Sequence, residues 1–169
     1  MNVLAICGST RAQSSNKRYL TAIGRLGHRW AYTLFEDLAA LPAFNPDLDL
    51  PETVRKFLSL LSAADGVVIC TPEYAMGVPG ALKNAIDWTV AESAFSGKPT
   101  ALVTASLDGR KGHAALMETL KVIEARMTPE TELIISHAQT RIDPTGTITD
   151  AKTLSQVTAV VRALEGLMG

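Results

Sequence analysis

Five short apolar runs divide the chain, separated by longer segments in which polar residues, proline and glycine are frequent. The run at residues 67–70 is rich in β-branched side chains, which is typical of a strand buried on both faces of a sheet. By the same argument we expect strands at residues 3–7, 30–35, 67–70, 100–105 and 133–136, the last continuing towards Ile142 as an extended segment.

Between these runs, apolar residues recur at i, i+3, i+4 and i+7, which indicates helices with one buried face. Helices are expected at residues 15–27, 51–61, 80–90 and 116–127, and from Thr149 or Asp150 to Met168. Ser14 or Ser15 suits the N-cap of the first helix. Residues 37–51 predict a connection with at most one helical turn, and residues 106–111 predict a loop.

Strands that alternate with helices along the whole chain predict a doubly wound α/β domain. We therefore expect residues 1–169 to form one domain, a three-layer sandwich of flavodoxin type with a five-stranded parallel sheet of order 2-1-3-4-5 and helices on both faces. In this order the strand sequence reverses between the first and third strands, and ligands bind at that point. The loops that follow these two strands are residues 8–15 and 72–80.

Composition narrows the functional class. The net charge of −1 argues against general nucleic-acid binding, and 47% hydrophobic residues can supply a sizeable core. Residues 1–35 carry five bases and no acid. Arg25 and Arg29 are explained by ordinary solvated helix charge, whereas Arg11 falls in a loop at a helix start, where an anion could sit. No apolar run reaches the roughly 18 residues of a membrane span, and no signal peptide is visible, so a cytoplasmic protein without membrane contact is expected.

Cysteine and histidine patterns give no support for a metal site. Cys7 and Cys70 lie at the ends of apolar runs and outside any C-x-x-C motif, so both are predicted to be reduced and buried. His28, His113 and His137 are scattered without the spacing of metal ligands, and structural or surface roles are expected for them.

The first loop has the chemistry that a phosphate group needs. Residues 8–16 read GSTRAQSSN, which places small hydroxyl residues and one arginine where a strand turns into a helix. Hydroxyl donors, backbone N–H groups and the positive helix end all favour an anion there. The loop matches neither the Walker nor the dinucleotide pattern, and a serine-rich helix cap is an alternative explanation.

The second loop suits a flat ring. Residues 71–88 read TPEYAMGVPGALKNAIDW, in which prolines restrict the backbone, glycines allow close approach and Tyr74 offers a flat face with a polar tip. From spacing alone an ordinary surface loop is an equal alternative. However, this segment resembles the second motif of the NADPH-dependent FMN reductase family of flavin, quinone, azo-dye and chromate reductases. Gly-Ser-x-Arg-x-x-Ser-x-Asn at residues 8–16 resembles the first motif.

The resemblance implies an FMN site at these loops. Ser9, Arg11, Ser14 and Asn16 would hold the FMN phosphate, and the backbone of residues 72–76 would line the isoalloxazine ring, although Ala75 replaces an asparagine common in relatives. The loop at residues 106–114 matches relatives least, and Arg110 and Lys111 there are either NADPH-phosphate contacts or a solvated pair. The expected cofactor-binding set is Ser9, Arg11, Ser14, Ser15, Asn16, Pro72, Glu73, Tyr74, Ala75, Met76, Ser106 and Gly109.

The function expected from this resemblance is hydride transfer from NADPH or NADH to N5 of FMN and then to a quinone, flavin or similar small acceptor, in a ping-pong sequence. No catalytic side chain is required, and Glu73 is expected to serve in hydrogen bonding or charge pairing. A homodimer or homotetramer is expected, with the helix at residues 80–88 as candidate contact surface. The alternatives are a non-enzymatic flavodoxin-type electron carrier, against which the near-neutral charge argues, and a domain whose site is empty or binds another mononucleotide.

Overall fold

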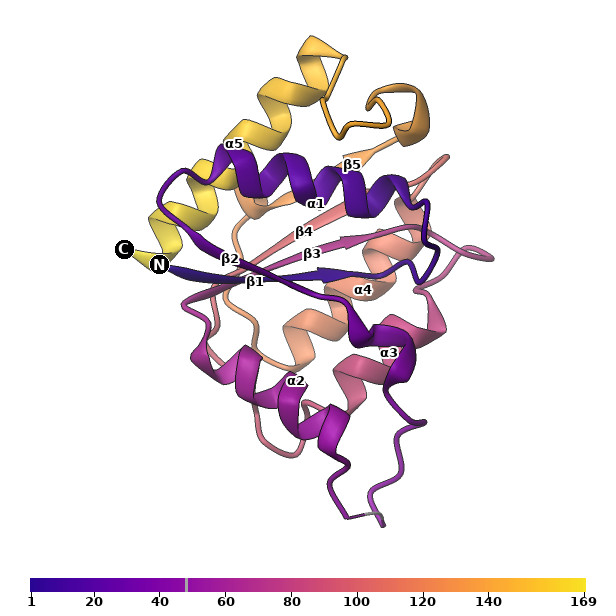
Figure 1. Cartoon of the computed structure of the whole chain (residues 1–169), viewed down its shortest axis with the longest axis vertical. Helices are drawn as coiled ribbons and strands as arrows, with labels where there is room; N and C mark the ends of the chain where they lie inside the picture. The colour runs from indigo at the N-terminus through magenta and orange to yellow at the C-terminus, as the bar shows by residue number, and fades with distance from the viewer. Residues whose placement is uncertain (48) are drawn as a thin grey trace.

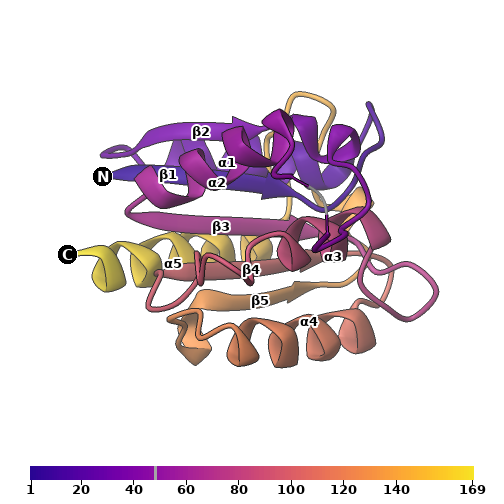
Figure 2. The same ribbon diagram turned by 90° about the horizontal axis from the view of Figure 1, so that it is seen from below.

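A five-stranded parallel sheet forms the centre of the computed structural model, which describes residues 1–47 and 49–169. Its strands follow the order β2-β1-β3-β4-β5 from edge to edge, as Figure 2 shows, so the predicted order is confirmed. All neighbouring strands pair in parallel. The strand bounds are β1 (Asn2–Cys7), β2 (Ala31–Phe35), β3 (Gly66–Thr71), β4 (Thr100–Ala105) and β5 (Glu132–Ile135).

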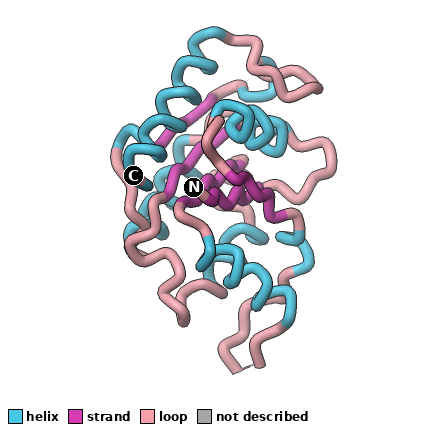
Figure 3. Tube along the Cα trace, turned by 60° about the vertical axis from the view of Figure 1, so that its left-hand side comes forward, coloured by secondary structure: helices cyan, strands magenta, loops and turns pink. Residues whose placement is uncertain are grey.

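Helices cover both faces of the sheet and complete the predicted three-layer sandwich (Figure 1). Helices α1 (Ser15–Leu26) and α5 (Ala151–Met168) lie on one face, and α2 (Glu52–Ala63), α3 (Gly80–Asp87) and α4 (Arg110–Val122) lie on the other. Short 3₁₀ turns, η1 (Asp37–Ala40), η2 (Pro129–Thr131) and η3 (Ala138–Thr140), occur in the connections. Figure 3 shows the strands enclosed by these helices.

The alternating side chains of each strand build two hydrophobic cores. Val3, Ala5 and Cys7 of β1 pack with α1 and α5, whereas Leu4 and Ile6 pack with the helices of the opposite face. This follows from the two-residue period of a strand and explains why the strands read as continuous apolar runs. Burial on both faces fixes the register of the sheet, and with it the positions of the loops at the carboxyl ends of the strands.

Helix α3 is shorter than predicted. It ends at Asp87, and Val90, expected on its buried face, lies in a turn and is 54% exposed. The Thr89 hydroxyl and N–H both donate to the carbonyl of Ile86, which the N–H of residue 90 would use if the helix continued. Local hydrogen bonding by a threonine therefore ends this helix.

The position of α4 also differs from the prediction. The helix begins at Arg110, inside the expected loop, and ends at Val122 instead of continuing to Met127. Glu124 has a φ of +59°, a left-handed conformation that a helix cannot contain. Ile123 and Met127 nevertheless pack partly against the core, so their apolar spacing reflects burial and not a continuous helix.

The segment after β5 does not continue as a strand towards Ile142. His137 has a φ of +53° and turns the chain into η3. Its N–H donates to the carbonyl of Leu107, and the N–H of Ala138 donates to that of Ser106. These bonds draw residues 137–140 towards the end of β4.

The connection between β2 and α2 contains η1 and otherwise no helix or strand in residues 37–47 and 49–51, as predicted, while Leu48 lies outside the described residues. Both chain termini lie at the edge opposite to the carboxyl ends of the strands (Figure 2). None of the helices found in residues 1–47 and 49–169 has the length and apolar character needed to cross a bilayer.

Candidate active site

A pocket of about 420 Å³ opens at the carboxyl ends of the strands. The two loops singled out from the sequence lie on its walls, together with residues 105–107 after β4 and residues 137–140 after β5. Nine residues of the expected cofactor-binding set line it: Ser9, Arg11, Ser14, Ser15, Asn16, Pro72, Glu73, Tyr74 and Ser106. Ala75, Met76 and Gly109 do not line this pocket.

The first loop leaves a helix end open towards the pocket. Ser14 occupies the N-cap position of α1, as expected, but its side chain makes no capping hydrogen bond, and no acidic residue lies in the first turn. The first N–H groups of a helix have no partners within it and carry a partial positive charge. Ser14, Ser15 and Asn16 are buried and line the pocket, so this helix end can receive an anion.

The two loops meet directly. The hydroxyls of Ser9 and Tyr74 lie 3.5 Å apart, and the backbone N–H of Arg11 lies 3.4 Å from Ser9 Oγ. Arg11 and Tyr74 line the same pocket, so the expectation that these loops form one site is consistent with the structure. Arg11 is the one arginine or lysine on the walls of this pocket within the described chain, and no ion pair of the described residues involves it.

The second loop folds into a tight hairpin turn. Tyr74 and Gly77 exchange backbone hydrogen bonds of 3.1 and 2.9 Å, and the two residues between them, Ala75 and Met76, have φ values of +48° and +59°. Positive φ at both central positions is the requirement of a type I′ turn. The turn carries both side chains away from the pocket, which explains why neither residue lines it.

We expect Ala75→Asn to stabilise the protein by about 0.5–1 kcal/mol, because asparagine tolerates the left-handed conformation better than alanine does. Urea unfolding would measure the gain. Ala115→Asn is the matched control: Ala115 is exposed within α4, so the same change there should lower the free energy of unfolding by about 0.5 kcal/mol through lost helix propensity. A loss of stability from Ala75→Asn would contradict the explanation by backbone conformation.

Glu73 is engaged in the framework of the site. Its carboxylate accepts a hydrogen bond from the N–H of Gly112 at 2.6 Å, and its own N–H donates to Ser106 Oγ at 3.2 Å. A carboxylate at the first turn of α4 also interacts favourably with the positive end of that helix. The structure thus agrees with a hydrogen-bonding role for Glu73, as expected from the sequence. A Cβ on Gly112 would lie 2.9 Å from the carbonyl oxygen of Gly77, so only glycine allows this close approach.

In the loop after β4, Gly109 of the expected cofactor-binding set lies outside the pocket lining, and Arg110, for which two roles were open, is paired with a carboxylate. Gly109 is the N-cap of α4 with a φ of +93° and lies beside Thr104, Ile134 and Ser106. Arg110 donates two hydrogen bonds to the carboxylate of Asp108, at 2.8 and 3.1 Å. A partly neutralised arginine is a weaker attractor of a phosphate than the unpaired Arg11 on the pocket wall.

Residues 137–140 were not identified as part of the site from the sequence, because a strand was expected there. With Gln13, Ala105 and Leu107 they complete the lining. Ser136 is the last residue of the strand predicted at residues 133–136 and His137 comes directly after it, and the carboxyl ends of parallel strands share one edge. The position of these two polar residues at the end of a strand was the signal in the sequence that could have placed them at the site. His137 lines the pocket. His113 is instead buried and bonded to Thr104 and Glu132, as a structural histidine.

The cysteines agree with the prediction: both are buried and unpaired, in register on neighbouring strands. Desolvation by burial raises the pKa of both thiols. Within the described residues no group of three or more His, Cys, Asp or Glu side chains is placed to hold a metal ion.

Comparison with known proteins agrees with the fold and identifies the family. The chain is 36% identical over 175 residues to an NAD(P)H-dependent FMN reductase of Pseudomonas aeruginosa, covering 98% of this chain and 94% of the relative. It is 33% identical over 162 residues to a 2-hydroxy-1,4-benzoquinone reductase of a Burkholderia species, covering 90% and 88%. The structure of FerB, a flavoenzyme NAD(P)H:(acceptor) oxidoreductase of Paracoccus denitrificans, superimposes with a TM-score of 0.89 at 28% identity, covering 99% and 96%.

The family model described as NADPH-dependent FMN reductase matches residues 1–140, which include both loops and η3. This match confirms the resemblance stated from the two motifs, and with it an oxidoreductase family whose cofactors are FMN and NAD(P)H. The chain belongs to the NADPH-dependent FMN reductase family.

Proposed function

We propose that the protein is an FMN-dependent NAD(P)H oxidoreductase, which passes hydride from NAD(P)H through bound FMN to a quinone, flavin or similar small acceptor by a ping-pong mechanism. The observation that carries the proposal is the open N-terminus of α1. It has no acid in its first turn and no side-chain cap, and it faces a pocket that also contains Arg11. One end of the pocket therefore selects an anionic group.

The donor set at that end fits a single phosphate. Ser9 and Ser14 supply hydroxyls, Asn16 an amide, and Arg11 a guanidinium that can make charge-assisted hydrogen bonds. Glu73 is the one carboxylate on the pocket wall among the described residues, and it is bound to the Gly112 N–H. Repulsion of a phosphate by this carboxylate is therefore limited.

The other end of the pocket fits a flat ring. Pro72, Tyr74, Ala105 and Leu107 line it with apolar surface, and the neighbouring backbone and Ser106 provide polar groups at its edge. Tyr74 is 48% exposed and Leu107 is 74% exposed, so the mouth of the site is partly apolar and open. A planar acceptor such as a quinone can enter there once the nicotinamide has left.

The chain itself supplies binding and orientation. Bound FMN supplies the hydride chemistry, as flavins do in this class of enzyme. The hydrogen bonds from Gly112 to Glu73 and from Glu73 to Ser106 hold the loop after β3 against α4 and the end of β4. The α1 terminus and Arg11 hold the other end, which fixes the distance between the anion site and the ring site.

Quinones are the proposed acceptors because several relatives are named as reductases of quinones, among them one from Escherichia coli at 30% identity. A homodimer or homotetramer is proposed, with α3 as candidate surface. On that helix Leu82, Ala85 and Ile86 face the core, so only its opposite side, with Lys83, is available for such a contact.

Steady-state kinetics of the FMN-loaded protein test the proposal. With NADPH and a benzoquinone varied together, double-reciprocal plots should give parallel lines, as a ping-pong mechanism requires. Intersecting lines would contradict the mechanism. A protein that binds FMN tightly but oxidises neither NADPH nor NADH with any quinone would instead be the non-enzymatic electron carrier.

A further inference from the structure

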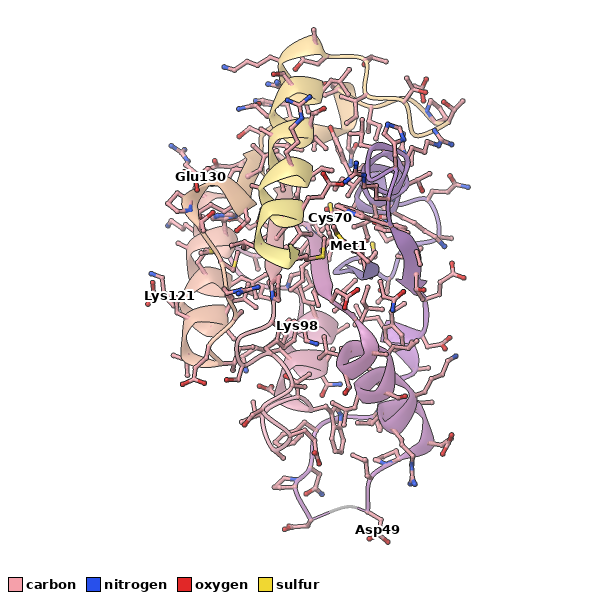
Figure 4. The ribbon with its side chains drawn as sticks, turned by 90° about the vertical axis from the view of Figure 1, so that its left-hand side faces the viewer. Met1, Asp49, Cys70, Lys98, Lys121 and Glu130 are labelled. Carbon is pink, nitrogen blue, oxygen red and sulfur yellow. The ribbon has the colours of Figure 1, made fainter. Side chains whose placement is uncertain are left out.

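A buried thiol lies behind the pocket wall and donates to a pocket residue. Cys70 of β3 is fully buried on the face of the sheet covered by α1 and α5 (Figure 4). Its Sγ donates a hydrogen bond of 3.3 Å to Oδ1 of Asn16. Asn16 is the second residue of α1, is only 3% exposed and lines the pocket. The hydrogen bond between Cys70 and Asn16 therefore connects the core of the sheet to the open N-terminus of α1.

The thiol determines which way the amide of Asn16 points. Desolvation raises the pKa of Cys70 well above its ordinary value, so the thiol keeps its proton and acts as a donor. A donor attracts the amide oxygen, whereas sulfur is a poor acceptor for the amide NH₂ group. With Oδ1 turned to the core, the NH₂ group faces the other way, and within the described residues it has no protein acceptor.

We infer that Cys70 is a positioning residue for the anion site: by holding Oδ1 of Asn16, it directs the amide N–H donors at the phosphate of the bound mononucleotide. This inference rests on the proposed function. Without a donor at position 70, the amide loses its preferred orientation, and the alternative orientation places an oxygen against the phosphate. Two like partial charges would then meet where a hydrogen bond is needed.

The neighbouring thiol offers a comparison within the same chain. Cys7 is in register with Cys70 on β1, is also buried, and donates to the backbone carbonyl of Ser9 at 3.3 Å. A backbone carbonyl cannot exchange an acceptor for a donor by rotating, so the Cys7 thiol orients no side-chain amide in the pocket. The two cysteines thus share burial and differ in what they orient.

Two substitutions separate positioning from packing. Cys70→Val keeps an apolar group of similar size but removes the donor, so stability should change little while FMN affinity falls about five-fold, as the loss of about 1 kcal/mol predicts. Cys70→Ser keeps a donor but buries a hydroxyl, so stability should fall while FMN affinity stays within about two-fold of the wild type. Quenching of flavin fluorescence gives the affinities, and urea unfolding gives the stabilities.

The ranking of the variants by FMN affinity distinguishes a positioning role of Cys70 from a packing role. If Cys70 only packs, affinity will follow stability, and Cys70→Ser will bind FMN more weakly than Cys70→Val; that order overturns the inference. An equal loss from Cys7→Val, which should stay within about two-fold of the wild type, also overturns it. Equal FMN affinity in all variants refutes the inference alone, whereas a wild-type protein without affinity for FMN refutes the proposed function as well.

Discussion

Replacing Arg11 by alanine should weaken FMN binding about thirty-fold and leave riboflavin binding nearly unchanged. A hydrogen bond to a charged group contributes about 1.5–3 kcal/mol, and every 1.4 kcal/mol changes the dissociation constant about ten-fold. Arg11 is the one lysine or arginine that lines the pocket within the described chain, so no neighbouring wall cation replaces it. Riboflavin lacks the phosphate, so its affinity should not change when Arg11 is lost.

Two further variants make this experiment specific. Arg11→Lys keeps the charge but loses the planar pair of donors, so its affinity for FMN should lie between those of the wild type and Arg11→Ala. Arg25→Ala removes an arginine from the last turn of the same helix, where its side chain donates to the carbonyl of Thr145, and FMN affinity should stay unchanged. Equal weakening for FMN and riboflavin in Arg11→Ala would contradict a phosphate contact.

The parts of the site that follow from the sequence are those set by local chemistry and strand order. An apolar run followed by Gly8-Ser9 predicts both the strand and the hydroxyl-rich turn after it, and the strand order brings Ser9 to Tyr74. Burial on both faces makes such runs conspicuous, and the topology then fixes which loops meet. The meeting of the two loops was therefore predictable without any contact being known.

The parts that did not follow depend on single contacts between distant segments. Residues 137–140 reach the pocket because His137 takes a left-handed conformation and bonds to the end of β4, and neither feature has a signal in the local sequence. The end of α3 is decided by the hydroxyl of Thr89, and that of α4 by the conformation of Glu124. Apolar spacing continues past the end of α4 because Ile123 and Met127 are still buried in part. Past the end of α3, Thr89 is buried but Val90 is exposed.

The largest expected effect on stability is that of Gly8→Ala, where the chain leaves β1 and enters the first loop. A Cβ on Gly8 would lie 2.2 Å from Oγ1 and 2.6 Å from Cβ of Thr71, and 3.0 Å from Cδ2 of Leu82. Thr71 and Leu82 are both buried, so neither has free space to move into. The N–H of Gly8 also donates to the carbonyl of Cys70, so the backbone cannot shift without losing that bond.

We expect Gly8→Ala to lower the free energy of unfolding by about 3 kcal/mol, since overpacking in a rigid core costs 1–3 kcal/mol or more, and to lower the melting temperature by roughly 6–12 °C. Gly80→Ala is the matched control: no atom lies within 4 Å of its added Cβ. It opens α3, so that change should be neutral or slightly stabilising through helix propensity. Thermal unfolding of the two variants beside the wild type measures both. If Gly8→Ala were as stable as Gly80→Ala, the close contact between the ends of β1 and β3 would not exist in solution, and the two loops of the site would not be held together as described.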